Sequence, residues 1–227
     1  MTTTRTSPTA TAAATPATAD AEILRDYGPW PGVDTVHGVS FDGNHVWFAV
    51  GPAVNVLDPS DGRVVRSLPV PGEAGTAFDG RFLYQIAGPV IRRLDPETGA
   101  EQGTIPCPGN GCASGLAWGE GTLWVGQFDD RRILQIDPET GAVLRQITSD
   151  RMVTGVTWAG DELWHGTWDG EQQTADLRRI DPETGGVIAV IAMPAGLAVS
   201  GLESDGNGTF YCGGGRSGKI RAVRKSI

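Results

Sequence analysis

The sequence predicts an all-β protein, a five-bladed β-propeller with four-stranded blades. Three observations predict it. The 227 residues include 33 Gly and 15 Pro, which would break a helical bundle, and also 7 Trp, which a disordered chain would lack. One pattern of strand, turn and strand recurs five times. The last copy lacks a strand that the N-terminal residues can supply, so we expect that strand to close the ring.

Each of the five repeats begins at a glycine and continues into two strands rich in aromatic residues. The pattern reads HGVSFDGNHVWFAV from His37 and TGVTWAGDELWHGT from Thr154. The anchoring glycines of the five copies are Gly38, Gly75, Gly115, Gly155 and Gly201. A period of roughly forty residues with four short strands indicates a propeller blade.

A turn of the type Asp-Pro-x-x-Gly joins the third and fourth strands in four of the repeats. It reads DPSDG from Asp58 and DPETG from Asp95, Asp137 and Asp181. The Asp side chain can cap the turn, Pro fixes φ at the next position, and Gly permits a left-handed exit. We therefore expect hairpins with a bulge at the glycine.

The fifth repeat ends after three strands, at KIRAVRKS from Lys219. The segment ILRDYGPWPG from Ile23 matches VVRSLPVPG from Val64, a fourth strand of the first repeat. We infer that residues 23–30 complete the fifth blade, which leaves no open sheet edge. An open sandwich built from the same hairpins is the alternative.

The expected domain organisation is a short tail followed by one propeller domain. The tail, residues 1–20, is rich in Thr, Ala and Pro and is expected to be disordered. The propeller spans residues 21–227, with blades at about 37–72, 73–111, 112–150, 151–196, and 197–227 together with 21–31.

Residues that recur in the repeats are expected to build the scaffold. The anchoring glycines would let the backbones crowd together near the axis. Aromatic side chains at one shared position of the second strand, and at another of the first strand, are expected to pack between adjacent blades. They are Trp47, Tyr84, Trp124, Trp164 and Tyr211 on the second strands and Phe41, Phe78, Trp118 and Trp158 on the first.

The net charge of the chain limits the classes of partner that it can bind. A net charge of -9 argues against binding to nucleic acid or to an anionic membrane. No apolar run of about eighteen residues and no apolar signal core are present, so we expect a cytoplasmic protein, monomeric or weakly homo-oligomeric. We expect free thiols in a reducing compartment, with a Cys107–Cys112 disulfide as the alternative.

The residue before each anchoring glycine differs between repeats and would ring the mouth of the central channel. These positions hold His37, Ala74, Ser114, Thr154 and Ser200. By analogy with other propellers, ligands bind at this mouth. His37 titrates near neutral pH, and the hydroxyls suit a small polar ligand. Alternatively, His37 caps a loop and the hydroxyls hold channel water.

Two further candidates come from the fourth repeat. His165 precedes the longest loop between a second and a third strand, residues 167–176. Long loops on rigid scaffolds often carry function, and Trp168 in this loop could cover a ligand. A plain surface insertion is the alternative.

Charged residues complete the predicted site. Glu73 could orient His37, and Arg151 could hold an anionic group. Glu203 stands where the other repeats have Ser, Ala or Thr, so we expect its carboxylate to be paired or functional. The candidates are His37, His165, Glu203 and Glu73 for catalysis and Ser114, Thr154, Ser200, Arg151, Trp168 and Gln127 for substrate binding.

No cofactor is predicted. A divalent metal is the alternative, because Cys107 and Cys112 on one loop could bind a metal together with a histidine. The sequence contains no Gly-rich phosphate loop, GxSxG or HExxH motif.

Two phrases carry a resemblance to known propellers. GLAWGEGTLWVGQFDDRRILQIDPETGAV from Gly115, and LWHGTW with LRRIDPETGGV from Leu163, resemble the glutaminyl cyclase (glutamine cyclotransferase) family of five-bladed propellers. They are also similar to the YVTN/virginiamycin B lyase-like group, which is typically seven-bladed. The resemblance covers about residues 21–227 and implies the fold and a site at the mouth. The cyclase family commonly has a carboxylate before the anchoring glycine, and none of the five positions here is acidic.

We expect a protein that acts on a small polar molecule at the channel mouth. As an enzyme it would be a lyase, a cyclising transferase or an isomerase. His37 or His165 would be the general acid or base, with Glu73 or Glu203 as the orienting carboxylate. The alternative is a non-catalytic module that binds a protein or glycan through Trp168, Phe128, Asp129 and Asp130.

Overall fold

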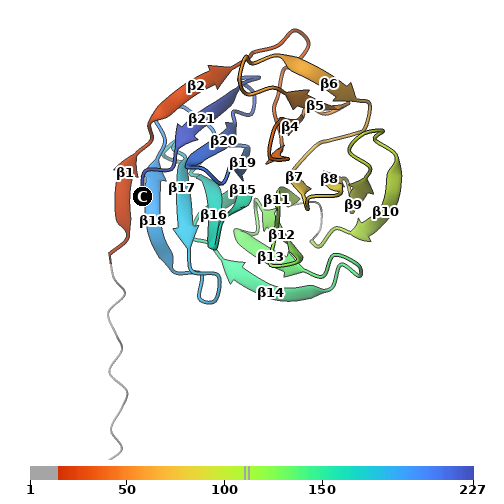
Figure 1. Cartoon of the computed structure of the whole chain (residues 1–227). Coiled ribbons are helices and arrows are strands. Elements are labelled where there is room, and N and C mark those ends of the chain that lie inside the picture. The colour runs from red at the N-terminus through yellow and green to blue at the C-terminus, as the bar shows by residue number, and fades with distance from the viewer. Residues whose placement is uncertain (1–14, 110, 112) are drawn as a thin grey trace, which may run out of the picture.

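The computed structural model describes residues 15–109, 111 and 113–227, which form a ring of five antiparallel sheets (Figure 1). The first three blades, from the innermost strand outward, are β3 (Val39–Phe41), β4 (Val46–Ala49), β5 (Val54–Leu57) and β6 (Val64–Leu68); β7 (Thr76–Phe78), β8 (Leu83–Ala87), β9 (Val90–Leu94) and β10 (Glu101–Pro106); and β11 (Ala113–Gly119), β12 (Thr122–Gln127), β13 (Arg132–Ile136) and β14 (Val143–Thr148). The fourth is β15 (Met152–Ala159), β16 (Glu162–Trp168), β17 (Asp176–Ile180) and β18 (Val187–Ala192), and the fifth is β19 (Gly201–Ser204), β20 (Thr209–Gly213), β21 (Ile220–Arg224) and β2 (Ile23–Tyr27). The predicted five-bladed propeller is confirmed.

The N-terminal strand β2 closes the ring, as the sequence predicts. It pairs antiparallel with β21, in a register that joins Ile23 to Val223 and Tyr27 to Ile220. Tyr27 is buried in the core that Tyr211 and Ile220 also form. The first and last strands of the propeller domain thereby complete one sheet, and folding of the fifth blade requires both ends of the chain.

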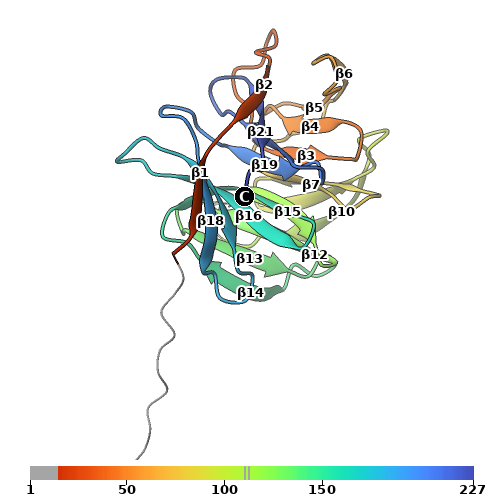
Figure 2. The ribbon, with the colours of Figure 1, turned by 60° about the vertical axis from the view of Figure 1, so that its left-hand side comes forward.

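A strand that the sequence analysis missed precedes β2. Residues Ala17–Asp20 form β1, which pairs in parallel with β18 and adds a fifth strand to the fourth blade. The disordered tail predicted over residues 1–20 is therefore wrong for this part, and residues 1–14 lie outside the described range. The outer edge of β18 offers unpaired backbone groups, which can pair with a Thr/Ala segment whatever its composition. Figure 2 shows β1 beside β18 and continuing into β2.

The repeated turns have the predicted chemistry. In the second blade the carboxylate of Asp95 accepts hydrogen bonds from the backbone N–H of Glu97 at 3.0 Å and of Thr98 at 2.8 Å. The N–H of Gly99 donates to the Asp95 carbonyl, and Gly99 has a φ of 73°, in the left-handed region. The register shifts by one residue between Glu101 and Gly103, so the bulge lies on the strand after the turn and not at Gly99, where it was expected.

Aromatic side chains pack between adjacent blades, which confirms the scaffold prediction. Tyr84 stacks on Trp118 with ring centroids 5.7 Å apart, and Trp124 meets Trp158 edge-on at 5.4 Å. In each pair a second-strand residue of one blade contacts a first-strand residue of the next. The last blade packs on the first in the same way, through Tyr211 and Phe41 at 5.7 Å.

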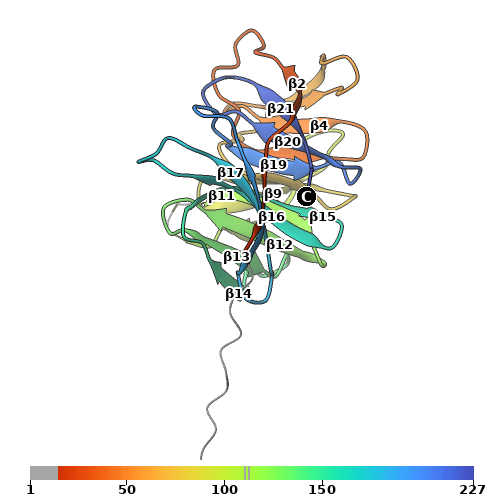
Figure 3. The ribbon, with the colours of Figure 1, turned by 90° about the vertical axis from the view of Figure 1, so that its left-hand side faces the viewer.

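The anchoring glycines close the channel at the centre of the ring. A Cβ placed on Gly75 would lie 2.3 Å from the backbone N of Leu116, and one on Gly155 would lie 2.4 Å from that of Leu202. The space between the five glycines leaves no room for a water molecule. The channel therefore has two separate ends, which face opposite sides of the ring seen edge-on in Figure 3. The described residues form strands and no helix that could cross a membrane.

Candidate functional site

Two adjoining hollows form the mouth of the propeller above the closed glycine ring. The smaller has a volume of about 180 Å³ and the larger about 370 Å³, and Ser114 and Ser200 line both. The smaller hollow is lined by His37, Glu73, Ala74, Ala113, Ser114 and Ser200. The larger is lined by Ser114, Phe128, Thr154, Trp168, Ala198, Val199, Ser200, Gly215 and Arg216. Six of the ten predicted site residues line these two hollows: His37, Glu73, Ser114, Thr154, Ser200 and Trp168.

His37 provides the titratable group of the mouth. Its backbone N–H donates to the Ala49 carbonyl at 2.9 Å, which fixes the loop between the fifth and first blades. Partial burial lowers the pKa of His37 below 6.5, while the carboxylate of Glu73 acts in the opposite direction. The imidazole is therefore mostly neutral at pH 7 and can accept a proton from a bound molecule.

The two serines of the ring link adjacent blades. Ser114 Oγ donates to the Val153 carbonyl at 2.6 Å, and Ser200 Oγ donates to the Val36 carbonyl at 2.6 Å. Each acceptor lies directly before the mouth position of the next blade. The serine hydroxyl protons are therefore bonded within the protein. Ser200 Oγ also accepts from the Gly215 N–H at 3.0 Å, so Ser114 Oγ and the remaining lone pair of Ser200 Oγ are possible acceptors for a ligand.

The larger hollow combines an apolar wall with one exposed cation. Phe128, Trp168 and Val199 supply the apolar surface, and Arg216 lies at its edge. Arg216 is exposed and forms no ion pair among the described residues. Arg216 is not among the residues predicted for the site, although it lies in the loop between the second and third strands of the fifth blade, a type of loop that faces the mouth.

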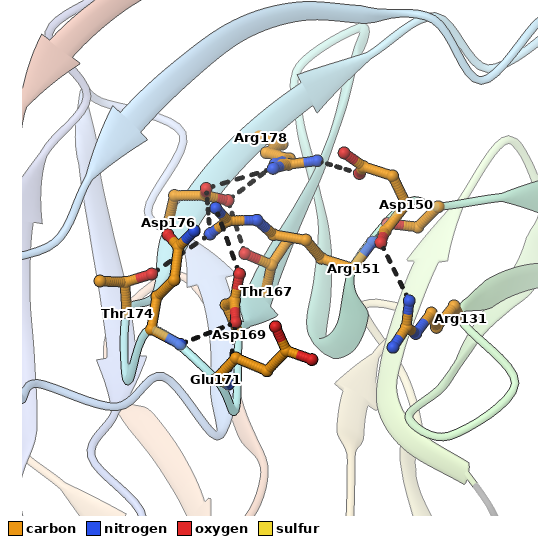
Figure 4. A network of polar contacts seen from close by, with 11 residues as sticks. Arg131, Asp150, Arg151, Thr167, Asp169, Glu171, Thr174, Asp176 and Arg178 are labelled. Carbon is orange, nitrogen blue, oxygen red and sulfur yellow. Dashed lines mark hydrogen bonds and ion pairs between the residues drawn. The ribbon is translucent and has the colours of Figure 1, made fainter.

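Arg151 is engaged in a polar network rather than pointing freely into the mouth (Figure 4). Its guanidinium donates to the carboxylate of Asp176 at 3.1 Å. Asp176 is buried and also accepts from Thr167 Oγ1 at 2.6 Å and from Arg178 Nε at 2.8 Å. Arg178 in turn pairs with Asp150. This network fixes the base of the loop that carries Trp168.

A third hollow, of about 410 Å³, is lined by Arg131, Asp150, Arg151, Met152, Trp168, Asp169, Gly170 and Glu171. Trp168 lines both this hollow and the larger mouth hollow, whereas Arg151 lines only the third hollow among the three.

His165 lies away from the mouth, between the third and fourth blades. Its side chain is 1% exposed and contacts a cavity among isoleucines. Burial and the nearby Arg178 guanidinium lower the pKa of His165 to about 4, so the ring is neutral at pH 7. The structure does not bring His165 together with His37 in the mouth hollows.

Glu203 lies past the glycine ring, toward the opposite end of the channel. Its carboxylate accepts a hydrogen bond from Thr157 Oγ1 and one from the backbone N–H of Ser204 at 2.8 Å. Burial raises the pKa of Glu203 to about 7 despite these hydrogen bonds. The Glu203 carboxylate is therefore hydrogen-bonded, as predicted. It does not line the mouth hollows.

Gln127 also lies outside the mouth hollows. Its side-chain N–H donates to the Pro108 carbonyl at 2.5 Å, and its oxygen accepts from Arg132 Nε at 2.7 Å. The side chain is fully buried and holds the loop after β10 against β12.

The part of the chain that the structure describes contains no group of three or more His, Cys, Asp or Glu that could hold a metal ion. The alternative of a metal or a disulfide at Cys107 and Cys112 involves a residue outside the described range, since Cys112 is not described.

Comparison with known proteins gives structural relatives only. No family model and no curated protein matches the sequence. The fold is similar to that of a glutaminyl cyclase from Myxococcus xanthus, with a TM-score of 0.75 and 18% identity over 92% of this chain and 98% of that one. A chain of the mitotic checkpoint complex (TM-score 0.53, 15% identity, 83% of this chain and 63% of that one) and one of Kuenenia stuttgartiensis hydrazine synthase (0.51, 21%, 79% and 55%) are also similar. The resemblance to the cyclase propellers thus holds for the fold, and that to the YVTN/virginiamycin B lyase-like group stays a prediction.

Proposed function

We propose that this propeller is a cyclising transferase that binds the N-terminal glutamine of a peptide at its mouth and converts it to a five-membered lactam. The observation that carries the proposal is the position of His37. This imidazole, neutral at pH 7 in most molecules, lies in a blind hollow that the glycine ring closes from below. A substrate there meets a proton acceptor and cannot pass through.

The reaction needs only one proton-transfer group. The α-amino nitrogen attacks the side-chain amide carbon, a C–N bond forms, and the bond from that carbon to the amide nitrogen breaks. His37 removes a proton from the attacking amine and returns one to the departing nitrogen, which leaves as ammonia. No oxidant, reductant or metal is required for this balance.

The remaining mouth residues can bind the parts of such a substrate. Arg216 can donate to a carbonyl oxygen, and the Ser114 and Ser200 oxygens can accept from the amide or amine N–H groups. Phe128 and Trp168 offer an apolar wall to the methylene groups and to the next residue of the peptide. The fold similarity to a protein called glutaminyl cyclase supports the choice of this reaction among the cyclising transferases.

The test is ammonia release from a glutaminyl peptide. The wild type should release ammonia from a peptide with a free N-terminal Gln and none from the N-acetylated peptide, whose nitrogen is a poor nucleophile. His37→Gln should lower kcat about 100-fold or more, because general acid–base groups contribute at least that much. The matched control is His45→Gln, since His45 lies in the turn between β3 and β4 on the opposite side of the ring.

The pH profile gives a second measurement. The wild-type rate should rise as the pH increases through the pKa of His37, which lies below 6.5, because only the neutral imidazole accepts a proton. Equal rates in wild type and His37→Gln would contradict the role of His37. Tight peptide binding without ammonia release would contradict catalysis and favour a binding module.

A further inference from the structure

A separate cavity lies between the third and fourth blades, away from the mouth. Its volume is about 210 Å³. It is lined by Ile133, Ile147, Thr148, Ser149, Asp150, His165, Ile180, Gly185 and Val187. The isoleucines belong to the hydrophobic core between the two blades, so the inner part of the cavity is apolar.

His165 is the buried polar side chain of this cavity, whereas Thr148 and Asp150 in the lining are exposed and Ser149 is half-buried. It lies in the middle of β16, and Leu163, two residues before it on the same face, belongs to the core that faces the third blade. The Nδ1–H of His165 donates to the Gly166 carbonyl at 3.3 Å, because that carbonyl can only accept. Since the ring is neutral, Nε2 carries a lone pair. Among the described residues, Nε2 has no hydrogen-bond partner.

The other blades show that a histidine is not needed here for folding. The equivalent positions hold Phe48, Val125 and Cys212, which are fully buried apolar side chains, and Gln85. The Gln85 amide donates to backbone carbonyls, with the shortest bond, to Ile86, at 2.9 Å. Gln85 Oε1 also has no hydrogen-bond partner among the described residues. Of the five equivalent residues, His165 is the one that lines this cavity.

We propose that this cavity binds a small uncharged molecule, about the size of one six-membered ring, that carries a single O–H or N–H group and donates it to Nε2 of His165. The size follows from the volume, because an apolar cavity of about 150 Å³ is large enough for benzene. The absence of charge follows from the buried isoleucines beside His165, because the charged lining residue, Asp150, is exposed and paired with Arg178. The single donor follows from Nε2 of His165, since the lining residues Thr148 and Ser149 are exposed and half-buried, respectively.

The probes that test this are phenol and toluene, which differ by a hydroxyl in place of a methyl group. Their dissociation constants are measured by calorimetry for the wild type, for His165→Phe and for two further variants. His165→Phe places the residue of the first blade at this position and keeps the ring shape. Val187→Phe fills the cavity from β18, and Trp168→Ala alters the mouth. The melting temperature of each variant without a probe shows that it is folded.

Wild-type protein should bind phenol, and Val187→Phe should abolish that binding while Trp168→Ala leaves it unchanged. Replacing His165 by Phe should weaken phenol relative to toluene by roughly tenfold or more, because the hydroxyl then has no acceptor in the cavity. An unchanged phenol-to-toluene ratio in His165→Phe would overturn the proposal. Loss of phenol binding in Trp168→Ala, or no binding of phenol by the wild type, would also overturn it.

Discussion

The two ends of the central channel differ in what their polar groups contact. At the mouth, His37 faces an open hollow, and Arg216 has no ion-pair partner among the described residues. At the other end, the Glu203 carboxylate is enclosed and hydrogen-bonded to Thr157 and Ser204. Of these three described side chains, His37 and Arg216 at the mouth are accessible, whereas Glu203 is enclosed and hydrogen-bonded.

This difference shows how a repeated scaffold can have two unlike ends. The five blades share their strands and turns, and a glycine ring separates the ends. The mouth is lined at positions where the blades differ, such as His37 against Ala74. Three changes, to the ring and to each end, test this separation.

The largest effect is expected for Gly115→Ala, which changes the ring between the two ends. A Cβ at Gly115 would lie 2.7 Å from the backbone N of Val156 and 2.8 Å from the carbonyl carbon of Gly155. Both atoms belong to the backbone of the fourth blade and cannot rotate away, so the third and fourth blades must move apart. We expect the free energy of unfolding to fall by about 3 kcal/mol, measured by denaturant titration.

The control is Gly170→Ala, in the loop between β16 and β17. A Cβ there would approach only Trp168 Nε1, at 3.8 Å, so stability should change by no more than about 0.5 kcal/mol. Similar losses in the two variants would show that the glycine ring is not the tight part of the fold.

The next effect concerns Glu203 and pH. Its pKa in the folded protein is about 7, against an ordinary value of 4.5, so the folded state binds the proton more tightly than the unfolded state. Stability from this group is therefore greatest below pH 4.5 and is lost as the pH rises to about 7. The loss amounts to about 3 kcal/mol at most.

Glu203→Gln should remove most of this pH dependence, as followed by urea unfolding between pH 4.5 and 8. Glu171→Gln, a change at an exposed carboxylate, should retain it. The difference in unfolding free energy between wild type and Glu203→Gln should fall as the pH rises. A difference that rises with pH would contradict the burial of the Glu203 carboxylate.

The smallest effect is expected for Ser200→Ala at the mouth. Ser200 Oγ donates to the Val36 carbonyl at 2.6 Å and accepts from the Gly215 N–H at 3.0 Å. Loss of these bonds should lower the free energy of unfolding by about 1 kcal/mol, measured by thermal unfolding. Ser67→Ala, at an exposed position on β6, should have no measurable effect, and an equal loss there would remove the assigned linking role of Ser200.

The fold could be predicted because the same sequence pattern of glycine, strands and turn recurs along the chain. Five glycines at similar intervals and the DPETG turns specify blades, and the match between segments 23–30 and 64–72 predicts the ring closure. Strand β1 could not be predicted this way, because Ala17–Asp20 (ATAD) matches no strand of the repeats and pairs through its backbone with an available edge.

The site was predictable only where it follows from the first strand of each blade. The position before each glycine correctly places His37 and the ring hydroxyls at the mouth. Side-chain direction along β16 decides that His165 faces the third blade, and pairing with Asp176 decides that Arg151 is engaged. The placement of His165 and the pairing of Arg151 cannot be derived from loop length or residue type alone.

The most direct test of the mouth as the working end uses the three histidines of the chain as reporters. His37 lies at the mouth, His45 on the opposite side, and His165 in the cavity between blades. Imidazole signals are followed by NMR while a peptide with an N-terminal glutamine is added at a pH where turnover is slow. The account predicts that the His37 signals shift and that those of His45 and His165 stay in place. A shift confined to His45 would contradict it.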